Sequence, residues 1–241
     1  MLGASKSFIA SLRKQKHENK FLLFLDNVKI IKDAIKNKSI KVEHLLTSLD
    51  KLPFDYEGEV YRVDDKTIES LANTKTPQKV LCVAYLTQHK VVLPKTNFLV
   101  LDSLQDPGNV GTLIRTAKAS GFETVFLVDS VRKQNDKLIR SSVGAVFDSK
   151  VYEMTRAEFV EYAKANKLKL VMTDMDGENV FEAKINEIVG VVVGNEGQGV
   201  CDEIAALCYK TLKIPMKKGI ESLNAGVSGS IIMYELNKNN F

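Results

Sequence analysis

The sequence predicts an α/β protein whose second half forms a parallel sheet that is buried on both faces. Short apolar segments rich in β-branched residues alternate with segments of helical periodicity along the 241 residues. In the second half these apolar segments are continuous, as expected of strands that are covered on both sides. Glycine, asparagine and proline follow several of them, at the positions where an α/β fold places its ligand-binding loops.

The first half of the chain is expected to form a small α/β/α domain. Residues 6–15 combine helical spacing of apolar residues with several basic side chains, and residues 28–37 repeat that spacing. Asp64 precedes a third helical segment that ends near Ala72, and aspartate is a favoured N-cap residue. Strands are expected at 21–25, 42–47, 58–63 and 80–85.

The second half repeats the alternation more cleanly, and apolar strands followed by helices indicate parallel pairing. We expect one domain over residues 1–93, a linker at 94–97 and a second domain over 98–241. Helices are expected in the second domain at 110–120, 156–166, 202–206 and 222–236. Strands are expected there at 98–101, 124–128, 151–153, 168–173, 188–193 and 211–214.

The composition is that of a soluble globular protein. Hydrophobic residues make up 44% and charged residues 27% of the chain. No apolar run reaches the roughly 18–20 residues of a membrane helix, and no secretion signal is visible, so we expect a cytoplasmic protein without a membrane partner. The three cysteines form no close pair, and the histidines lie far from Cys201 and Cys208, so we expect reduced thiols and no metal site.

The charge of the chain is unevenly spread. The net charge is +4, but residues 1–97 hold 17 Lys and Arg against 11 Asp and Glu, whereas residues 98–241 hold 17 against 19. A basic front half favours a polyanionic partner. A solvated lysine-rich surface is the alternative, and the charge alone does not decide between the two.

The first of three polar blocks in the second half reads Asp-Pro-Gly-Asn-Val-Gly over residues 106–111. Asp106 and Pro107 are expected to start a turn, and Gly108-Asn109 suit a backbone outside the usual φ range. Arg115 follows one helical turn later, where its planar guanidinium could bind a phosphate or carboxylate. A surface ion pair is the ordinary alternative for a single arginine.

The second block reads Gly-Asn-Glu-Gly-Gln-Gly over residues 194–199 and lies between a predicted strand and a predicted helix. It lacks the Gly-Lys-Ser/Thr ending of a P-loop and does not follow the dinucleotide-binding pattern. A nucleotide-type site and a tight β–α connection are both compatible with such a loop.

The third block runs from Ile214-Pro215-Met216 to Ser222-Leu223-Asn224. Proline prevents continuation of the preceding strand, and Ser222 is expected to cap the last helix. The backbone amides at this helix start could hold an adenine or a carboxylate. Because all three blocks follow strands, we expect one site assembled from distant segments.

Together the blocks resemble the SpoU (TrmH-type) family of the SPOUT methyltransferases, which methylate ribose 2′-hydroxyls of RNA. They occur in the family's order and spacing, with 20 residues from Gly194 to Ile214 and nine more to Leu223. The resemblance covers residues 98–241 strongly. Residues 1–93 are more weakly similar to the family's L30e-type substrate-binding domain, and residues 24–28 depart from its usual Phe-Leu-Val-Glu-Gly.

The resemblance implies a deep trefoil knot formed by roughly 190–241, S-adenosylmethionine as methyl donor, and a homodimer whose catalytic centre lies close to the subunit interface. The implied cofactor-binding residues are Gly194, Glu196, Gly197, Ile214, Met216, Ser222 and Leu223. The implied catalytic residues are Asn109, Arg115, Glu196, Ser222 and Asn224. The residues expected to bind RNA are Lys6, Arg13, Lys14 and Lys16, together with Arg140 in a segment that is similar to one on the family's RNA side.

Arg115 is expected to have the central role in the chemistry. The methyl donor carries an excellent leaving group, so the enzyme has to align the ribose oxygen and stabilise the forming alkoxide without a metal. A guanidinium with a pKa above about 12 is a poor proton acceptor. We therefore interpret Arg115 as an electrostatic clamp on the RNA phosphate and the incipient alkoxide, oriented by Asn109.

The expected function is S-adenosylmethionine-dependent RNA (ribose-2′-O)-methylation. The separate first domain and the basic N-terminus favour ribosomal RNA, with transfer RNA as the alternative. A non-catalytic RNA-binding protein of the same fold is the main rival from another class, and the intact set of polar site residues argues against it. A nucleotide-dependent phosphotransferase is more distant, because the lysine that grips phosphate is missing.

Overall fold

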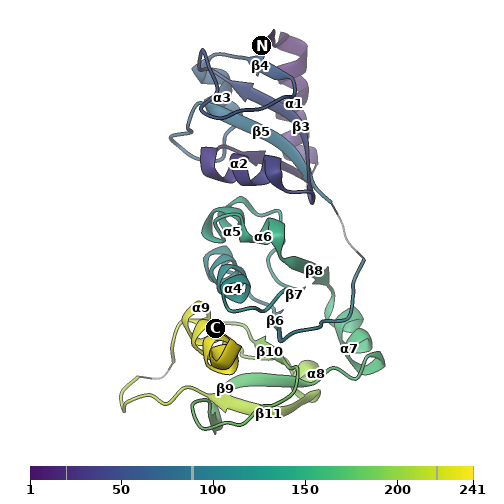
Figure 1. Cartoon of the computed structure of the whole chain (residues 1–241), viewed down its shortest axis with the longest axis vertical. Helices are drawn as coiled ribbons and strands as arrows, with labels where there is room; N and C mark the ends of the chain where they lie inside the picture. The colour runs from purple at the N-terminus through teal and green to yellow at the C-terminus, as the bar shows by residue number, and fades with distance from the viewer. Residues whose placement is uncertain (20, 88–89, 221, 241) are drawn as a thin grey trace. The chain divides into compact units, whose positions relative to one another are not determined.

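The computed structural model describes residues 1–19, 21–87, 90–220 and 222–240 (Figure 1). Contacts divide the chain into two compact units, Met1–Gln88 and His89–Phe241. The expected linker, 94–97, directly precedes the first strand of the second unit. The expected domains include positions outside the described residues, namely 20, 88 and 89 in the first and 221 and 241 in the second. No helix in the described ranges is long and apolar enough to cross a membrane.

In the described residues, the N-terminal unit holds a mixed five-stranded sheet with the strand order β1-β4-β3-β5-β2. Strand β5 runs antiparallel to β2 and β3, whereas β4 runs parallel to β1 and β3. The strands are β1 (Leu2–Gly3), β2 (Leu22–Leu25), β3 (Ile40–Thr47), β4 (Val60–Arg62) and β5 (Val80–Leu86). The predicted strands are confirmed, and β1 is too short for periodicity to detect.

Helices α1 (Lys6–Glu18), α2 (Val28–Lys36) and α3 (Asp65–Leu71) cover this sheet. Helices α1 and α3 share an apolar core with it, which includes Leu12, Phe24 and Leu71. Figure 1 shows α2 in front of the sheet and α1 behind it, as expected of an α/β/α arrangement. Asp64 caps α3 as predicted, because its carboxylate accepts a hydrogen bond from the Thr67 N–H at 2.7 Å.

In the part of the second unit that the structure describes, six strands form a sheet in which every neighbouring pair is parallel. Their order is β11-β9-β10-β6-β7-β8. The strands are β6 (Phe98–Asp102), β7 (Thr124–Val128), β8 (Lys150–Met154), β9 (Leu170–Asn179), β10 (Gly190–Val193) and β11 (Cys208–Lys213). Every residue of β6, β7 and β10 is buried, which confirms the expected parallel sheet with both faces covered.

Helices lie on both faces of the parallel sheet. Helix α4 packs against α5, α6 and α9, while α7 and α8 pack on a separate apolar core around Phe126, Phe159 and Ile204 (Figure 1). The bounds are α4 (Pro107–Ala119), α5 (Asp136–Ser141), α6 (Ala145–Asp148), α7 (Arg156–Ala165), α8 (Asp202–Ala205) and α9 (Ala225–Asn237). The sequence does not predict α5 and α6, because they are too short to establish a helical period.

The starts of α4 and α9 correct two expectations. Asp106 is an N-cap rather than a turn residue, and it accepts hydrogen bonds from the N–H groups of Gly108 and Asn109, both at 3.2 Å. Gly108 and Asn109 therefore lie in the first helical turn and need no unusual φ. Asn224, and not Ser222, caps α9, because its side-chain oxygen accepts a hydrogen bond from the Val227 N–H at 3.3 Å.

Helix α4 is held closely against α5. Lys137 donates a hydrogen bond to Asp106 at 2.8 Å, and this bond, with two from backbone N–H groups, lowers the pKa of Asp106 below its usual value. A Cβ atom at Gly111 would lie 1.9 Å from Ser141 Oγ and 2.7 Å from the Leu138 carbonyl oxygen. Only glycine at this position permits so close an approach of the two helices.

We expect Gly111→Ala to lower the free energy of unfolding by roughly 1–3 kcal/mol, because the added methyl group overpacks the contact between α4 and α5. Urea denaturation followed by circular dichroism measures this. Gly108→Ala on the same helix is the control, since its Cβ would approach only the end of the Asp106 side chain, at 3.0 Å. An equal loss in both variants would contradict the explanation.

Candidate functional site

The three sequence blocks meet at the side chain of Asn109. Its Nδ2 donates a hydrogen bond to Glu196 Oε1 at 2.9 Å, and its Oδ1 accepts one from Asn224 Nδ2, also at 2.9 Å. Asn109 lies in the first turn of α4, Glu196 follows β10, and Asn224 caps α9. A side-chain amide can donate and accept at once, so asparagine can join a carboxylate to a second amide. The structure therefore brings the three blocks together, as expected of loops that follow strands of one parallel sheet.

The loop after β10 is a tight turn that presents Glu196. Asn195 and Gly199 exchange two backbone hydrogen bonds, each 2.9 Å long, and the Asn195 side chain accepts another from the Gly197 N–H. Gly199 has a φ of 73°, which favours glycine. A Cβ atom at Gly194 would lie 2.2 Å from the Gly199 carbonyl carbon. The turn therefore requires glycine at both of its ends.

A buried carboxylate anchors this loop to β6. Asp102 accepts hydrogen bonds from the Cys201 N–H at 2.7 Å and from Ser103 Oγ at 3.0 Å, and the Arg156 guanidinium lies 3.7 Å away. The Asn195 amide donates to the Ser103 carbonyl at 2.9 Å. Burial raises the pKa of the Cys201 thiol to about 11, so this thiol stays protonated at neutral pH and is no nucleophile.

A long bulge in β9 forms a further wall of the site. Met172 pairs with Thr211 of β11, and the next pair along the ladder is Glu178 with Leu212. Residues 173–177 therefore leave the ladder between these two pairs. Bulges often redirect side chains beside functional sites.

Gly177 makes this bulge possible. A Cβ atom at this position would lie 2.7 Å from the carbonyl carbons of both Thr211 and Leu212. Because glycine lets the backbones approach, the bulge returns to the ladder after turning Thr173 and Asp174 toward a cavity.

The loops and the bulge surround a cavity of about 450 Å³, a volume within the usual range for small-molecule sites. Its apolar side chains come from Met175, Val193, Leu212, Ile214, Met216, Leu223, Ala225 and Ile232. Its polar side chains come from Thr173, Asp174, Asn195, Glu196, Ser222, Asn224 and Ser228. Among the described residues that line it, none is a lysine or an arginine. The apolar side chains of the cavity suit a flat apolar part of a ligand, and its carboxylates suit a positive charge. The described lining holds no cation that could bind a polyphosphate.

Most of the residues implied for cofactor binding line this cavity. They are Gly194, Glu196, Ile214, Met216, Ser222 and Leu223. Gly197 is not among the lining residues that the structure describes, and its N–H donates to the Asn195 side chain within the turn. The sequence analysis misses Thr173, Asp174 and Met175, which also line the cavity. Their position directly after a predicted strand was the signal, since ligands bind at the carboxyl ends of parallel strands.

Arg115 lies elsewhere on α4. Six residues of an α-helix advance about 9 Å along the axis and turn the side chain about 120° away from the starting face. Arg115 is exposed, and within the described residues no hydrogen bond joins it to Asn109. It is also not among the described residues that line the cavity. The expectation that Asn109 orients Arg115 is therefore wrong, because the Asn109 amide is directed to Glu196 and Asn224.

Two of the basic residues expected to bind RNA are held by the N-terminal unit itself. The Lys16 ammonium donates hydrogen bonds to the carbonyl oxygens of Leu71 and Ala72, at 2.7 and 2.6 Å, where α3 ends. The Arg13 guanidinium donates to Ser70 Oγ through two nitrogens, at 3.1 and 3.0 Å. Lys16 thus stabilises the carboxyl end of a helix, as a cation can.

The other basic residues are more accessible. Lys14 lies 3.9 Å from Glu18, a separation at which an exposed pair contributes little. Lys6 and Arg140 are exposed, at the start of α1 and in the last turn of α5. In the described ranges, no group of three or more His, Cys, Asp or Glu side chains is placed to hold a metal ion.

Comparison with known proteins identifies the family. The sequence model of the SpoU rRNA Methylase family matches residues 96–234, which is more than half of the chain. The chain belongs to this family. The 23S rRNA (guanosine(2553)-2′-O)-methyltransferase RlmP of Bacillus subtilis is 32% identical over 233 residues, which cover 93% of this chain and 92% of that protein.

Solved SpoU-type structures share the fold over nearly the whole chain. The SpoU methyltransferase AviRb of Streptomyces viridochromogenes, crystallised with AdoMet, has a TM-score of 0.85 at 21% identity and covers 98% of both chains. An AdoMet-bound rRNA methyltransferase of Sinorhizobium meliloti also has a TM-score of 0.85, at 20% identity, and covers 100% of this chain and 98% of its own.

Proposed function

We propose that this SpoU family member is an S-adenosylmethionine-dependent methyltransferase that acts on a ribose 2′-hydroxyl of ribosomal RNA. The observation that carries the proposal is the hydrogen-bonded chain from Glu196 through Asn109 to Asn224 beside a cavity without basic side chains. The B. subtilis relative, named for 2′-O-methylation of a 23S rRNA guanosine, matches both units of the chain and favours ribosomal over transfer RNA.

The side chains of the cavity fit the proposed cofactor. Ile214, Met216 and Leu223 offer apolar surface for an adenine ring, and the carboxylates of Asp174 and Glu196 suit the positive sulfonium and ammonium groups. When bound, S-adenosylmethionine would supply a methyl group on a positively charged sulfur, which is an excellent leaving group. A cationic ligand also explains why lysine and arginine are missing from the described lining, since like charges would repel.

The polar side chains at the cavity would orient the ribose. Asn109 holds Glu196 and Asn224 in one geometry, and Ser222 adds a hydroxyl nearby. Arg115 would stabilise the developing negative charge and an adjacent phosphate, since a guanidinium is a donor that does not give up its proton. Because Arg115 does not line the described cavity, we infer that it completes the site only when RNA or a second subunit is present.

We further propose the architecture that the family implies. The N-terminal unit would be an L30e-like substrate-binding domain, which its mixed sheet and two covered faces support. Roughly residues 190–241 would form the trefoil knot. Strand β11 lies at the sheet edge beside β9, whereas α9 packs on α4 and β10, so the intervening segment has to cross back over the sheet. We propose the cytoplasm as the place where the enzyme would act on ribosomal RNA.

A homodimer is the proposed assembly. Val227 and Tyr234 on α9 are 48% and 46% exposed and, seven residues apart, lie on the same side of the helix. An exposed apolar helix face is typical of a surface that another subunit covers. Because the site residue Asn224 caps α9, a dimer formed through this helix would place the interface beside the site.

Asp174→Ala should weaken the binding of S-adenosylmethionine roughly tenfold, because a hydrogen bond to a charged group is lost. Isothermal titration calorimetry measures this, with ATP as a ligand that should not bind. Asp176→Ala is the matched control, since Asp176 is also exposed in the bulge but is not among the lining residues. Equal effects of the two variants, or tight binding of ATP, would reject this assignment of the cavity.

Full-length protein should transfer tritiated methyl groups from S-adenosylmethionine to unmodified 23S rRNA. The phosphodiester bond on the 3′ side of the labelled nucleotide should resist alkaline cleavage, because a methylated 2′-oxygen cannot attack the phosphate. Arg115→Lys should reduce turnover by two or more orders of magnitude, because the planar guanidinium is lost from the reacting centre. Its affinity for S-adenosylmethionine should stay within twofold of the unmodified protein. Near-normal turnover would remove Arg115 from its role, and transfer to tRNA alone would change the proposed substrate.

The purified protein should sediment as a dimer, with a mass close to twice 26.8 kDa. The double variant Val227→Glu, Tyr234→Glu should sediment as a monomer, because it places charges on the proposed interface. Phe181→Glu, at a residue that is 51% exposed outside α9, is the control and should stay dimeric. A monomeric unmodified protein would refute the proposed assembly.

A further inference from the structure

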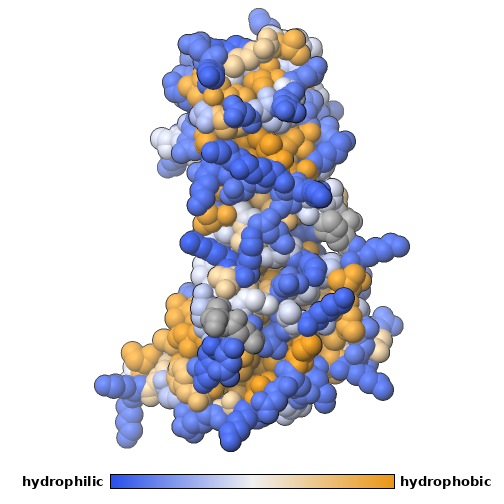
Figure 2. Space-filling view, viewed as in Figure 1, coloured by the Kyte–Doolittle hydropathy of each residue, from blue (hydrophilic) through white to orange (hydrophobic). Residues whose placement is uncertain are grey.

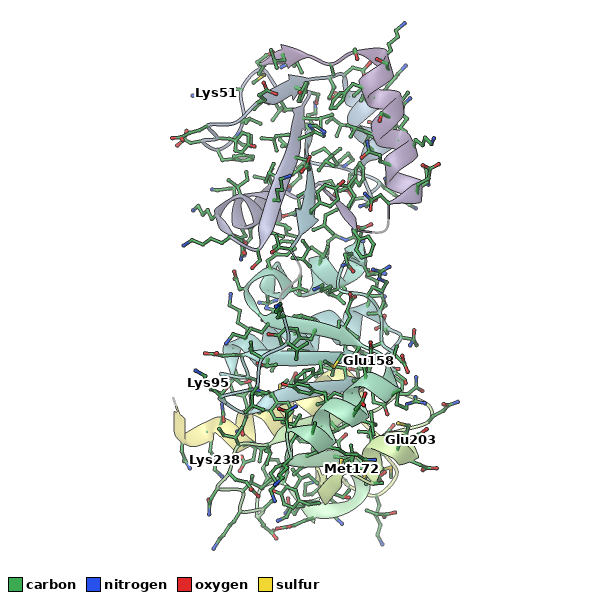
Figure 3. All side chains as sticks on the ribbon, turned by 90° about the vertical axis from the view of Figure 1, so that its right-hand side faces the viewer. Lys51, Lys95, Glu158, Met172, Glu203 and Lys238 are labelled. Carbon is green, nitrogen blue, oxygen red and sulfur yellow. The ribbon has the colours of Figure 1, made fainter. Side chains whose placement is uncertain are left out.

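A basic groove lies on the N-terminal unit, away from the helix α1 that the sequence singles out. It is formed by the exposed side of α2 and by the loop between β3 and β4, and it encloses about 670 Å³. We call it the α2 groove and define it by Lys32, Ile35, Lys36, Lys51, Phe54 and Asp55. Figure 3 shows Lys51 on the same side of this unit as α2.

The cations of the α2 groove are not used by the fold. Lys29, Lys32 and Lys36 lie within about 60° of one another around α2, so they form one row. No hydrogen bond or ion pair joins these lysines or Lys51 to another described residue. Because nothing within the described chain neutralises this row, an external anion would stabilise it.

Carboxylates near the groove do not cancel its charge. Asp33 is exposed on α2 beside the lysine row, and Asp55 lines the groove. The lining of the groove itself holds three lysines, Lys32, Lys36 and Lys51, against the one carboxylate of Asp55, so the lining carries a net positive charge. Helix α1 differs, because there Arg13 already donates to Ser70 of α3, and Lys16 donates to Leu71, the last residue of α3, and to Ala72, which follows it.

The groove also offers an aromatic surface. Phe54 is only partly buried, and Ile35, Leu52 and Pro53 lie with it in the lining. Figure 2 shows hydrophilic surface over α2 next to a hydrophobic area on this unit. Cations beside a partly exposed aromatic ring are features that bind single-stranded nucleic acid, because the cations contact phosphates and a base stacks on the ring.

We propose that the α2 groove binds an unpaired segment of the substrate RNA. Lys32, Lys36 and Lys51 contact its phosphates, and one unstacked base lies on Phe54. The groove then selects the RNA without taking part in the reaction. This inference rests on the proposed function, because it assumes that RNA is the substrate.

The test measures the binding of full-length protein to unmodified 23S rRNA over a range of salt concentrations. The triple variant Lys32→Ala, Lys36→Ala, Lys51→Ala should bind at least tenfold more weakly. Its slope of log affinity against log salt should be shallower by about two, since each phosphate contact to a single strand contributes roughly 0.7. KM for RNA should rise by the same factor as Kd, while kcat at saturating RNA and the affinity for S-adenosylmethionine stay within twofold.

Phe54→Leu separates stacking from charge. It keeps an apolar side chain but removes the ring, so affinity should fall roughly tenfold with an unchanged salt slope. Lys51→Glu covers the case in which changes on α2 disturb folding, because Lys51 is exposed on a loop. It should weaken RNA binding at least fivefold without changing the melting temperature.

The control removes the same number of charges from elsewhere on the chain, through Lys66→Ala, Lys75→Ala and Lys164→Ala, all exposed lysines outside the residues expected to bind RNA. An unchanged salt slope and KM in the groove variants, or a larger effect of this control, would overturn the proposal. Failure of the unmodified protein to methylate any RNA would instead refute the proposed function. The two failures are therefore distinguishable.

Discussion

The site depends on the hydrogen bonds of one side chain, that of Asn109. It joins residues that are 87 and 115 positions away along the chain, so one amide group connects three loops that are distant in sequence. The buried carboxylate of Asp102 also stabilises this arrangement, because it accepts a hydrogen bond from the Cys201 N–H and so fixes the end of the glycine-rich loop to β6. Removing the Asn109 amide would leave Glu196 and Asn224 to solvent, although the sheet beneath them would remain.

Local rules explain what the sequence predicts well. Continuous apolar strands, helical spacing and the cap at Asp64 depend on near neighbours, so periodicity and capping rules predict the parallel sheet and most of its helices. The first residue of a helix is harder to predict from the sequence. Where α4 begins decides whether the Asn109 side chain is directed to Arg115 or to Glu196. Asp106 caps that helix, so its first turn starts earlier than a turn at Asp106-Pro107 would suggest. The bulge in β9 depends on pairing with β11, a contact between strands that no local pattern contains.

The role of a charged residue likewise depends on its contacts as well as on its type. Counting lysines predicts a basic first half, but not which lysines are available to a partner. Lys16 is used within the N-terminal unit, as its bonds to the end of α3 show, whereas the row on α2 is not. Both lie on amphipathic helices of one small unit. Only the positions of carbonyl groups and carboxylates around each ammonium separate a structural cation from an available one.

The distribution of cations follows from the two ligands that the enzyme is proposed to bind. A methyl donor with a positive sulfur is bound best where no lysine or arginine is near, and the described lining of the cavity meets that condition. RNA needs the opposite environment, since its phosphates attract cations. Both ligands have to meet at one carbon atom, so the cations must stand outside the cavity yet close to its RNA side. Arg115 meets the first of these conditions, because it is exposed on α4 and is not among the described residues that line the cavity.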